Sequence, residues 1–257
     1  EGRAVERATH VLDAVRHLAG VDTRARIVSR NDFPTNVGLG ASASAFAAGA
    51  TAAAAALGLE LEERQLSAIA RLGAGSASRA VSGGFSLWHT GSDHDSSFAE
   101  RLDGGDLEMG IVAVVVKALK LTEDFHKEVV GSPFFRARLD YVEGALEEMR
   151  RAVDARDVEA IGHLAEADTL VLHGITMTGP SGRVLWKPET LVAMQEVWAM
   201  RDDGIPAHFS IDTGATVYVN CPAEHVVEVE RRLMDRELET LRCHVGGGAR
   251  TVDRHLV

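Results

Sequence analysis

The sequence predicts an α+β protein with two lobes, an N-terminal lobe over residues 1–106 and a C-terminal lobe over residues 107–257. Long segments with helical spacing of apolar residues alternate with short runs of Val, Ile and other strand-forming residues. The end of the chain follows the order strand, strand, helix, strand, which is typical of a split β-α-β half-domain. With 257 residues, of which 46% are hydrophobic, the chain is long enough to bury a full core.

The N-terminal lobe is predicted to be an α/β lobe with few strands. Apolar spacing and composition predict helices over residues 5–18, 45–57 and 62–72. Short apolar runs predict strands over residues 26–29 and 85–89. Two turns rich in glycine and serine, over residues 31–44 and 73–79, separate these elements.

The C-terminal lobe combines helices with a sheet. Its predicted helices cover residues 132–155, 157–173, 188–203 and 223–236. Its predicted strands cover residues 107–116, 207–211, 216–220 and 240–245. Asp212 lies in a short turn between two of these strands.

Composition argues against several classes of protein. The net charge of -11 opposes a nucleic-acid groove, because phosphate backbones need a basic field. No charge-free apolar run is long enough for a membrane span, and the first residues resemble neither a signal peptide nor a transit peptide. Cys221 and Cys243 have no metal-ligand or redox spacing. We therefore expect a reduced, cytoplasmic protein that binds neither nucleic acid nor a membrane.

The basic residues are almost all arginine. Among 27 basic residues the only lysines are Lys117, Lys120, Lys127 and Lys187. Few lysines with 38 acidic residues is typical of a surface adapted to concentrated salt. A genome rich in G and C explains the same ratio equally well, so both interpretations stay open.

The first glycine-serine turn carries the strongest chemical signal. It reads Pro-Thr-Asn-Val-Gly-Leu-Gly-Ala-Ser-Ala-Ser over residues 34–44 and leads into an alanine-rich helix. Glycines let backbone N–H groups approach an anion, and a helix N-terminus adds its dipole. Ser42 and Ser44 can add hydroxyl groups, although no Walker Gly-Lys-Ser/Thr is present. The turn is predicted to bind phosphate, the alternative being a glycine-capped helix that binds nothing.

These residues resemble a known family. Pro-x-x-x-Gly-Leu-Gly-x-Ser-Ala is similar to the ATP phosphate loop of the GHMP kinase superfamily. The preceding Ser-Arg-Asn-Asp-Phe-Pro-Thr of residues 29–35 resembles the lead-in of mevalonate diphosphate decarboxylases. Further stretches match the same enzymes in the same order, namely residues 75–79, 83–88, 132–135 and 209–215. The resemblance extends over nearly the whole chain. In the region after the strand predicted over residues 107–116, it is strongest to the archaeal phosphomevalonate decarboxylases.

The resemblance implies a two-lobed GHMP kinase fold and an ATP-dependent decarboxylation with Mg²⁺. Members of the family begin with a strand region holding an Ala-Leu-x-Lys-Tyr-Trp-Gly type segment, which this sequence does not contain. We therefore expect the N-terminal strand region of the fold to be missing from this chain. The family's homodimers also lead us to expect a homodimer.

The resemblance also assigns roles to single residues. A tertiary alcohol is a poor nucleophile and needs a positioned base, and Asp212 occupies the place of the family's catalytic aspartate. Arg79 is expected to grip the substrate carboxylate through two hydrogen bonds, with Ser76 and Asn31 as further substrate contacts. The ATP phosphates are expected to contact the loop residues Gly38, Leu39, Gly40, Ala41, Ser42 and Ser44. The metal ligands stay unassigned. Without the resemblance, Asp212 would be an ordinary turn residue and Arg79 a surface arginine.

Other polar groups are predicted to be structural or solvated. The sequence Asp-His-Asp of residues 93–95 lies in a polar loop and is expected to face solvent. His173, His208 and His244 are scattered and are expected to be structural. The triplet Gly246 to Gly248 either lies beside the substrate or forms a plain turn.

The favoured reaction is the decarboxylation of mevalonate 5-phosphate to isopentenyl phosphate. Relatives that use the diphosphate carry Ser-Ser-Arg where residues 120–124 of this chain read Lys-Leu-Thr-Glu-Asp, and acidic groups repel a second phosphate. The alternatives are decarboxylation of the 5-diphosphate, a mevalonate 3-kinase, and a catalytically silent ATP-binding regulator. The presence of Asp212, Arg79 and Ser42 argues against the silent form.

Overall fold

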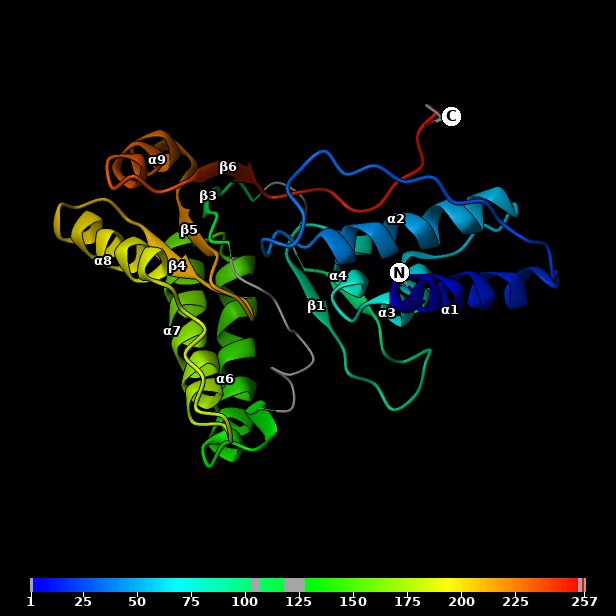
Figure 1. Cartoon of the computed structure of the whole chain (residues 1–257), viewed down its shortest axis with the longest axis horizontal. Helices are drawn as coiled ribbons and strands as arrows, with labels where there is room; N and C mark the ends of the chain where they lie inside the picture. The colour runs from blue at the N-terminus through cyan, green and yellow to red at the C-terminus, as the bar shows by residue number, and fades with distance from the viewer. Residues whose placement is uncertain (1, 103–106, 118–127, 254–255, 257) are drawn as a thin grey trace. The chain divides into compact units, whose positions relative to one another are not determined.

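The computed structural model describes residues 2–102, 107–117, 128–253 and 256, and the chain divides into two compact units (Figure 1). The first unit comprises Glu1–Thr35, Leu39–Gly105 and Gly246–Val257, and the second comprises Asn36–Gly38 and Asp106–Val245. Two short segments therefore depart from the predicted lobes. Residues 246–253 group with the first unit, and residues 36–38 group with the second.

Helices dominate the first unit. They are α1 (Gly2–Ala19), α2 (Ala41–Ala56), α3 (Glu63–Gly73) and the short α4 (Ala77–Ser82). A small antiparallel pair, β1 (Ser86–Trp88) and β2 (Ala99–Arg101), completes the unit. The core consists mainly of small side chains, with Ala47 and Ala50 of α2 packed against Val15 of α1. The alanine-rich sequence allows this close approach, because alanine has high helix propensity and little bulk.

Two predictions for the first unit were wrong. Residues 26–29 were predicted to form a strand, but no described strand pairs with them, and the Ile27 side chain is 54% exposed. An extended segment without a partner has no ladder of hydrogen bonds to stabilise it. The second helix begins at Ala41 rather than at Ala45, because Gly40 adopts the left-handed conformation (φ 74°) and turns the chain directly into the helix.

The second unit contains a four-stranded antiparallel sheet in the order β4-β5-β3-β6. Its strands are β3 (Gly110–Val114), β4 (His208–Ser210), β5 (Val217–Cys221) and β6 (Thr240–His244). Its helices are α6 (Phe135–Asp154), α7 (Val158–Met177), α8 (Pro188–Asp202) and α9 (Val226–Met234), with a 3₁₀ turn at Ala223–His225. The order β4, β5, α9, β6 confirms the strand-strand-helix-strand pattern at the end of the chain. No described helix is long and apolar enough to cross a membrane.

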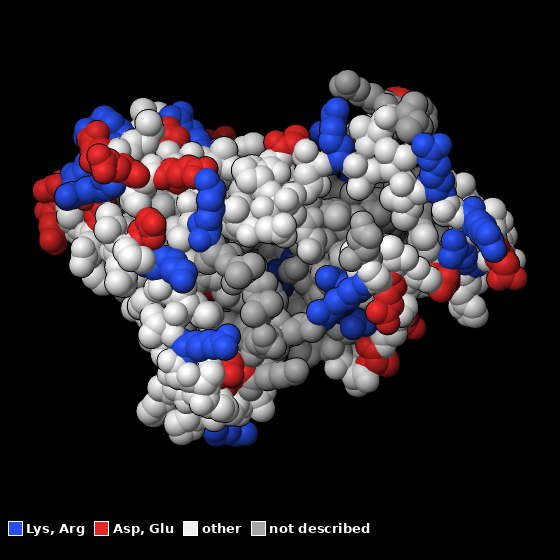
Figure 2. Space-filling model, viewed as in Figure 1, with Lys and Arg blue, Asp and Glu red and all other residues white. Residues whose placement is uncertain are grey.

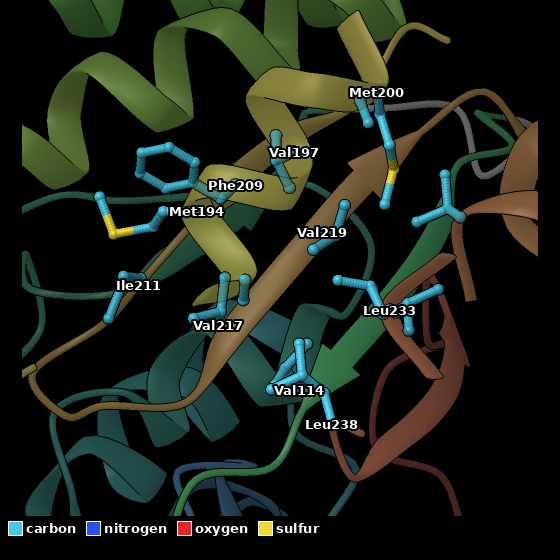
Figure 3. Packing of buried hydrophobic residues seen from close by; sticks show 14 of the residues in the cluster. Val114, Met194, Val197, Met200, Phe209, Ile211, Val217, Val219, Leu233 and Leu238 are labelled. Carbon is cyan, nitrogen blue, oxygen red and sulfur yellow. The ribbon is translucent and has the colours of Figure 1, made fainter. Parts of the chain in front are cut away.

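The two faces of this sheet have different characters. Phe209 of β4 and Val219 of β5 are fully buried against Val197 of α8 and Leu233 of α9 (Figure 3). Full burial of each such side chain contributes about 1.5–3 kcal/mol relative to exposure. His208, the neighbour of Phe209 on the strand, points to the opposite face and packs against α7.

Buried carboxylates tie the helices to the sheet. Glu166 of α7 accepts two hydrogen bonds from Arg201 of α8, at 2.7 and 2.9 Å, and one from the Phe209 N–H at 3.2 Å. Burial opposes the charge of Glu166, but hydrogen bonds from His208 and Arg201 outweigh it and lower the pKa to about 2. A second buried carboxylate, that of Glu196 on α8, accepts from Arg232 of α9 at 2.6 Å and from Arg236, just beyond α9, at 2.5 Å. On the surface, exposed acidic and basic side chains lie close to one another over α8 and α9 (Figure 2).

Candidate active site

Asp212 lies in the turn between β4 and β5, and its side chain is exposed. The preceding residue, Ile211, is buried in the core of the second unit. The alternation of side chains along an extended segment therefore turns the carboxylate outward as Ile211 turns inward. The carboxylate lines a groove of about 410 Å³ together with Ser210, Tyr218 and side chains of α6 and α7. An exposed carboxylate on a fixed turn is available as a general base.

Two side chains of helix α7 form hydrogen bonds with the backbone of the Asp212 turn. The Ile211 N–H donates to Oγ1 of Thr169 at 3.0 Å. Four residues further along the same helix, Nε2 of His173 donates to the carbonyl oxygen of Asp212 at 2.8 Å. Residues four apart share one face of a helix, so α7 contacts two successive residues of the turn.

His173 was predicted to be structural, and its contact with the Asp212 backbone was missed. Its side chain is 1% exposed, and burial lowers its pKa, so that the imidazole is neutral near pH 7. The single proton then lies on Nε2, which donates to Asp212. Among the residues that the structure describes, Nδ1 has no hydrogen-bond partner. The only local signal was the spacing of Thr169 and His173 on one helical face.

The far side of the turn is also fixed. Thr190, fully buried in the first turn of α8, donates to the Ala215 carbonyl oxygen at 2.8 Å. Thr216, which follows Ala215, accepts a hydrogen bond at its hydroxyl oxygen from the Val116 N–H at 3.2 Å. The turn is therefore held at both ends, which restricts the conformations open to Asp212.

The first part of the predicted phosphate loop contacts strand β5. The Thr216 hydroxyl donates to the Val37 carbonyl oxygen at 2.5 Å, and the Tyr218 hydroxyl donates to the Gly38 carbonyl oxygen at 2.6 Å. Gly38 has φ +93°, and a Cβ at this position would lie 3.3 Å from Cβ of Thr216. Glycine is therefore favoured at residue 38 both by its φ and by the close approach of the strand.

The second part of the loop forms the start of α2. Gly40 at the N-cap has no side chain, so the N–H groups of the first helical turn are free of a side-chain cap. The Ser42 side chain is exposed, whereas the Ser44 hydroxyl donates to the Ala41 carbonyl oxygen at 3.2 Å. Leu39 is partly buried. Free N–H groups and the helix dipole suit this turn to an anion such as phosphate.

Arg79 lies within α4 rather than in the preceding turn, and its side chain is exposed. No acceptor for its guanidinium occurs among the residues that the structure describes. It lines a cavity of about 630 Å³ in the first unit together with Ser44 and two glycine segments. The cavity is therefore lined by a cationic side chain and by Ser44 of the phosphate loop.

The C-terminal glycines form one wall of this cavity. The Gly84 N–H donates to the Gly246 carbonyl oxygen at 2.8 Å, and the Ala249 N–H donates to the Val81 carbonyl oxygen at 3.0 Å. A Cβ on Gly248 would lie 2.3 Å from that Val81 oxygen, so this close pairing of backbones requires glycine. The triplet thus belongs to the wall of the cavity that Arg79 lines.

The remaining predicted residues lie apart from these cavities. Ser76 at the N-cap of α4 and Asn31 before the loop are both exposed and line neither of them. Residues 93–95 are exposed, and hydrogen bonds from Ser96 lower the pKa of Asp93. No cluster of three or more His, Cys, Asp or Glu side chains able to hold a metal occurs in the described ranges. Residues 120–124 lie outside those ranges.

Comparison with known sequences points to one family. Residues 1–99 match the model of the diphosphomevalonate decarboxylase-like N-terminal domain. The phosphomevalonate decarboxylase of Haloferax volcanii is 44% identical over 256 residues, which are 98% of this chain and 79% of the relative.

Solved structures share the same fold. The mevalonate diphosphate decarboxylase of Staphylococcus aureus is 27% identical with a TM-score of 0.88, over 96% of this chain and 78% of that chain. A structure of MDDEF in complex with MVAPP, AMPPCP and magnesium is 31% identical with a TM-score of 0.85, over 94% of this chain and 76% of that chain. These matches confirm the α+β fold of the GHMP kinases and the resemblance that the motifs indicated. The chain belongs to the family of phosphomevalonate and diphosphomevalonate decarboxylases.

Proposed function

We propose that this protein uses ATP to decarboxylate mevalonate 5-phosphate, giving isopentenyl phosphate, ADP, phosphate and CO2. The observation that carries the proposal is the exposed Asp212 carboxylate on a turn that is fixed at both ends. The choice of the monophosphate is supported by the 44% identity to the Haloferax enzyme over nearly the whole chain.

The reaction has two parts. First, Asp212 accepts the proton of the tertiary 3-hydroxyl while the hydroxyl oxygen attacks the γ-phosphorus of ATP and ADP leaves. Then the bond from C2 to the carboxylate carbon breaks, its electron pair forms the double bond between C2 and C3, and the new phosphate leaves from C3. Arg79 binds the carboxylate through two hydrogen bonds and orients it for loss as CO2.

The phosphate-binding residues suit ATP. We assign the ATP phosphates to Gly38, Leu39, Gly40, Ala41, Ser42 and Ser44, because the first turn of α2 presents N–H groups without a side-chain cap. Mg²⁺ usually binds nucleotide phosphates and keeps most of its waters, with only one or two protein carboxylates. A site of that kind needs no dedicated cluster of protein ligands. Ser76 and Asn31 are retained as proposed substrate contacts.

Product analysis tests the function. The protein and ATP·Mg²⁺ are mixed in turn with mevalonate, mevalonate 5-phosphate and the 5-diphosphate, and ADP, CO2 and the organic product are measured. We expect isopentenyl phosphate from the 5-phosphate, with a kcat/KM at least about tenfold above that for the diphosphate. A preference for the diphosphate would instead assign the chain to the classical decarboxylases, which its solved neighbours represent. ADP without CO2 would indicate a 3-kinase, and no ADP with any substrate a silent ATP-binding protein.

We propose a cytoplasmic homodimer, as expected from the resemblance, and a salt-adapted archaeal source. The few lysines and the net charge of -11 support salt adaptation, as does the Haloferax relative. Sedimentation in low and high KCl would measure both the assembly and its dependence on salt.

A further inference from the structure

The start of β5 follows the turn of Asp212 and also contacts the first part of the phosphate loop. Thr216 immediately precedes β5 and Tyr218 is its second residue, so their side chains lie on the same side of the extended chain. Their hydroxyl groups donate to the carbonyl oxygens of Val37 and Gly38, at 2.5 and 2.6 Å. Two consecutive residues of the loop are thus bound by Tyr218 of β5 and by Thr216, which immediately precedes that strand.

The Thr216 hydroxyl joins three segments of the chain. It accepts from the Val116 N–H, just beyond β3, and donates its single proton to the Val37 carbonyl oxygen. The Thr216 residue is buried, so that loss of the hydroxyl would leave a buried N–H and a loop carbonyl without this partner.

The Tyr218 hydroxyl stays protonated and can therefore donate a hydrogen bond. Burial raises the pKa of Tyr218, and the nearby charge of Asp212 raises it further, so the phenol keeps its proton near neutral pH. The Tyr218 side chain also lines the groove that contains Asp212. The same phenol therefore lies beside the proposed base and bonds the loop.

We propose that Thr216 and Tyr218 are positioning residues, which fix residues 36–38 of the phosphate loop to the strand that carries the turn of Asp212. This inference rests on the proposed function, because the proposed reaction uses both the phosphate loop and Asp212. Each hydroxyl donates its proton to the loop backbone, so we assign neither a direct part in the chemical steps. Their effect is to hold the backbone of residues 36–38 against the strand that follows the turn of Asp212.

Loss of either hydroxyl should affect kcat and nucleotide binding differently. Backbone N–H groups can still bind phosphates when the loop is displaced slightly, but phosphoryl transfer is sensitive to small errors in position. Loss of either hydroxyl should therefore reduce kcat much more than it weakens nucleotide binding. A residue that contributes only to stability would change the unfolding midpoint and leave kcat unaltered.

The test uses single hydroxyl deletions with matched controls. Tyr218→Phe and Thr216→Val each remove one hydroxyl, and Thr216→Ser restores it. Tyr141→Phe and Thr176→Val are the controls, because they delete hydroxyls that make no contact with the loop in the described structure. We expect kcat to fall about tenfold in the first two variants with an ATP KM within about threefold, and to be near wild type in Thr216→Ser and both controls.

A double variant separates positioning from general structure. Asp212→Asn alone should reduce kcat by about 10³ by removing the base. If Tyr218 acts by aligning the loop with that base, adding Tyr218→Phe to Asp212→Asn should reduce kcat by less than about threefold further. A full additional tenfold loss in the double variant would contradict the proposal.

A readout without substrate keeps the inference independent of the proposed reaction. Hydrogen exchange of a peptide spanning residues 36–40, with a non-hydrolysable ATP analogue bound, should be about tenfold faster in Tyr218→Phe and unchanged in Tyr141→Phe. Equal exchange in the two variants would overturn the inference even if the enzyme decarboxylates mevalonate 5-phosphate. Faster exchange in a protein that converts no mevalonate phosphate would instead overturn the proposed function and keep the loop contact.

Discussion

The imidazole of His173 donates from Nε2 to the carbonyl oxygen of Asp212 at 2.8 Å. The histidine is buried on α7 and the aspartate is exposed in a turn 39 residues later in the chain. This contact fixes the backbone of the proposed base without using its carboxylate. The carboxylate is therefore free to take a proton while its main chain is held.

Loss of this contact should impair catalysis more than binding. His173→Phe keeps an aromatic ring against Trp186, whose centroid is 5.1 Å away, and removes the donor. We expect kcat to fall about tenfold with a substrate KM within about twofold, because the base is misplaced. His173→Gln, which retains an N–H donor, should recover part of the rate. His163→Phe on the exposed side of the same helix is the control, and an equal loss of rate there would contradict a specific role for His173.

Glu166 should make the second unit sensitive to acid. Its pKa in the folded protein is about 2, against an ordinary value of 4.5. A group with a lowered acid pKa contributes stability above the unfolded value and loses it as pH falls toward the folded value. The shift corresponds to about 3 kcal/mol that should be lost between pH 4.5 and about 2. Urea unfolding at several pH values would measure this slope.

The matched variant is Glu166→Gln, which removes the charge and keeps the shape. It should be less stable at pH 7 by a few kcal/mol, because it leaves Arg201 without its carboxylate. Its free energy of unfolding should depend less on pH than that of the wild type between pH 4.5 and 2. Parallel curves for the two proteins would show that Glu166 is not the group responsible.

Local sequence pattern predicted most of the secondary structure. Helical spacing located α1, α3, α6, α7 and α8, and Val-rich runs located β3 and β5, because these signals depend on neighbours in sequence. The start of α2 was misplaced because the left-handed conformation of Gly40 is set by the turn as a whole. Residues 26–29 were predicted as a strand from composition, which says nothing about whether a partner strand is present.

The proposed site could be assigned from the sequence only at residues that stand in a motif. Asp212, Arg79 and the phosphate loop stand in sequence motifs, whereas Tyr218 contacts Gly38 across 180 positions of the chain. Such a contact depends on tertiary packing, and neither residue has a local pattern that indicates the other. His173 was likewise predicted only as a structural residue, because no local pattern indicates its hydrogen bond to the Asp212 carbonyl oxygen.

The two serines of the loop should differ in function. The Ser44 hydroxyl donates to the Ala41 carbonyl oxygen, while the Ser42 side chain is exposed. Ser42→Ala should therefore lower the rate of phosphoryl transfer more than ATP affinity, by about tenfold in kcat, because the backbone N–H groups still hold the phosphates. Ser44→Ala should have the smaller effect on kcat. Nucleotide titration and single-turnover ADP formation would compare them, and a collapse of ATP affinity with unchanged turnover in Ser42→Ala would give the loop a different role.

Arg79 offers the sharpest test of carboxylate binding. Arg79→Lys keeps the positive charge and loses the planar pair of N–H donors that matches a carboxylate. Each hydrogen bond to a charged group contributes about 1.5–3 kcal/mol, so we expect kcat/KM to fall about a hundredfold. Release of CO2 should fall at least as much as formation of ADP, because the carboxylate must be oriented for the second half of the reaction.

The control for this variant lies in the same unit. Arg64 on α3 is an exposed arginine whose guanidinium lies over the Phe98 ring at 4.2 Å, away from the cavity that Arg79 lines. Arg64→Lys should keep the kinetics of the wild type. If Arg79→Lys also keeps them, the arginine does not bind the carboxylate. If ADP forms normally in Arg79→Lys while CO2 release is lost, Arg79 acts only after phosphorylation, since a group that also binds the ground state would slow both steps.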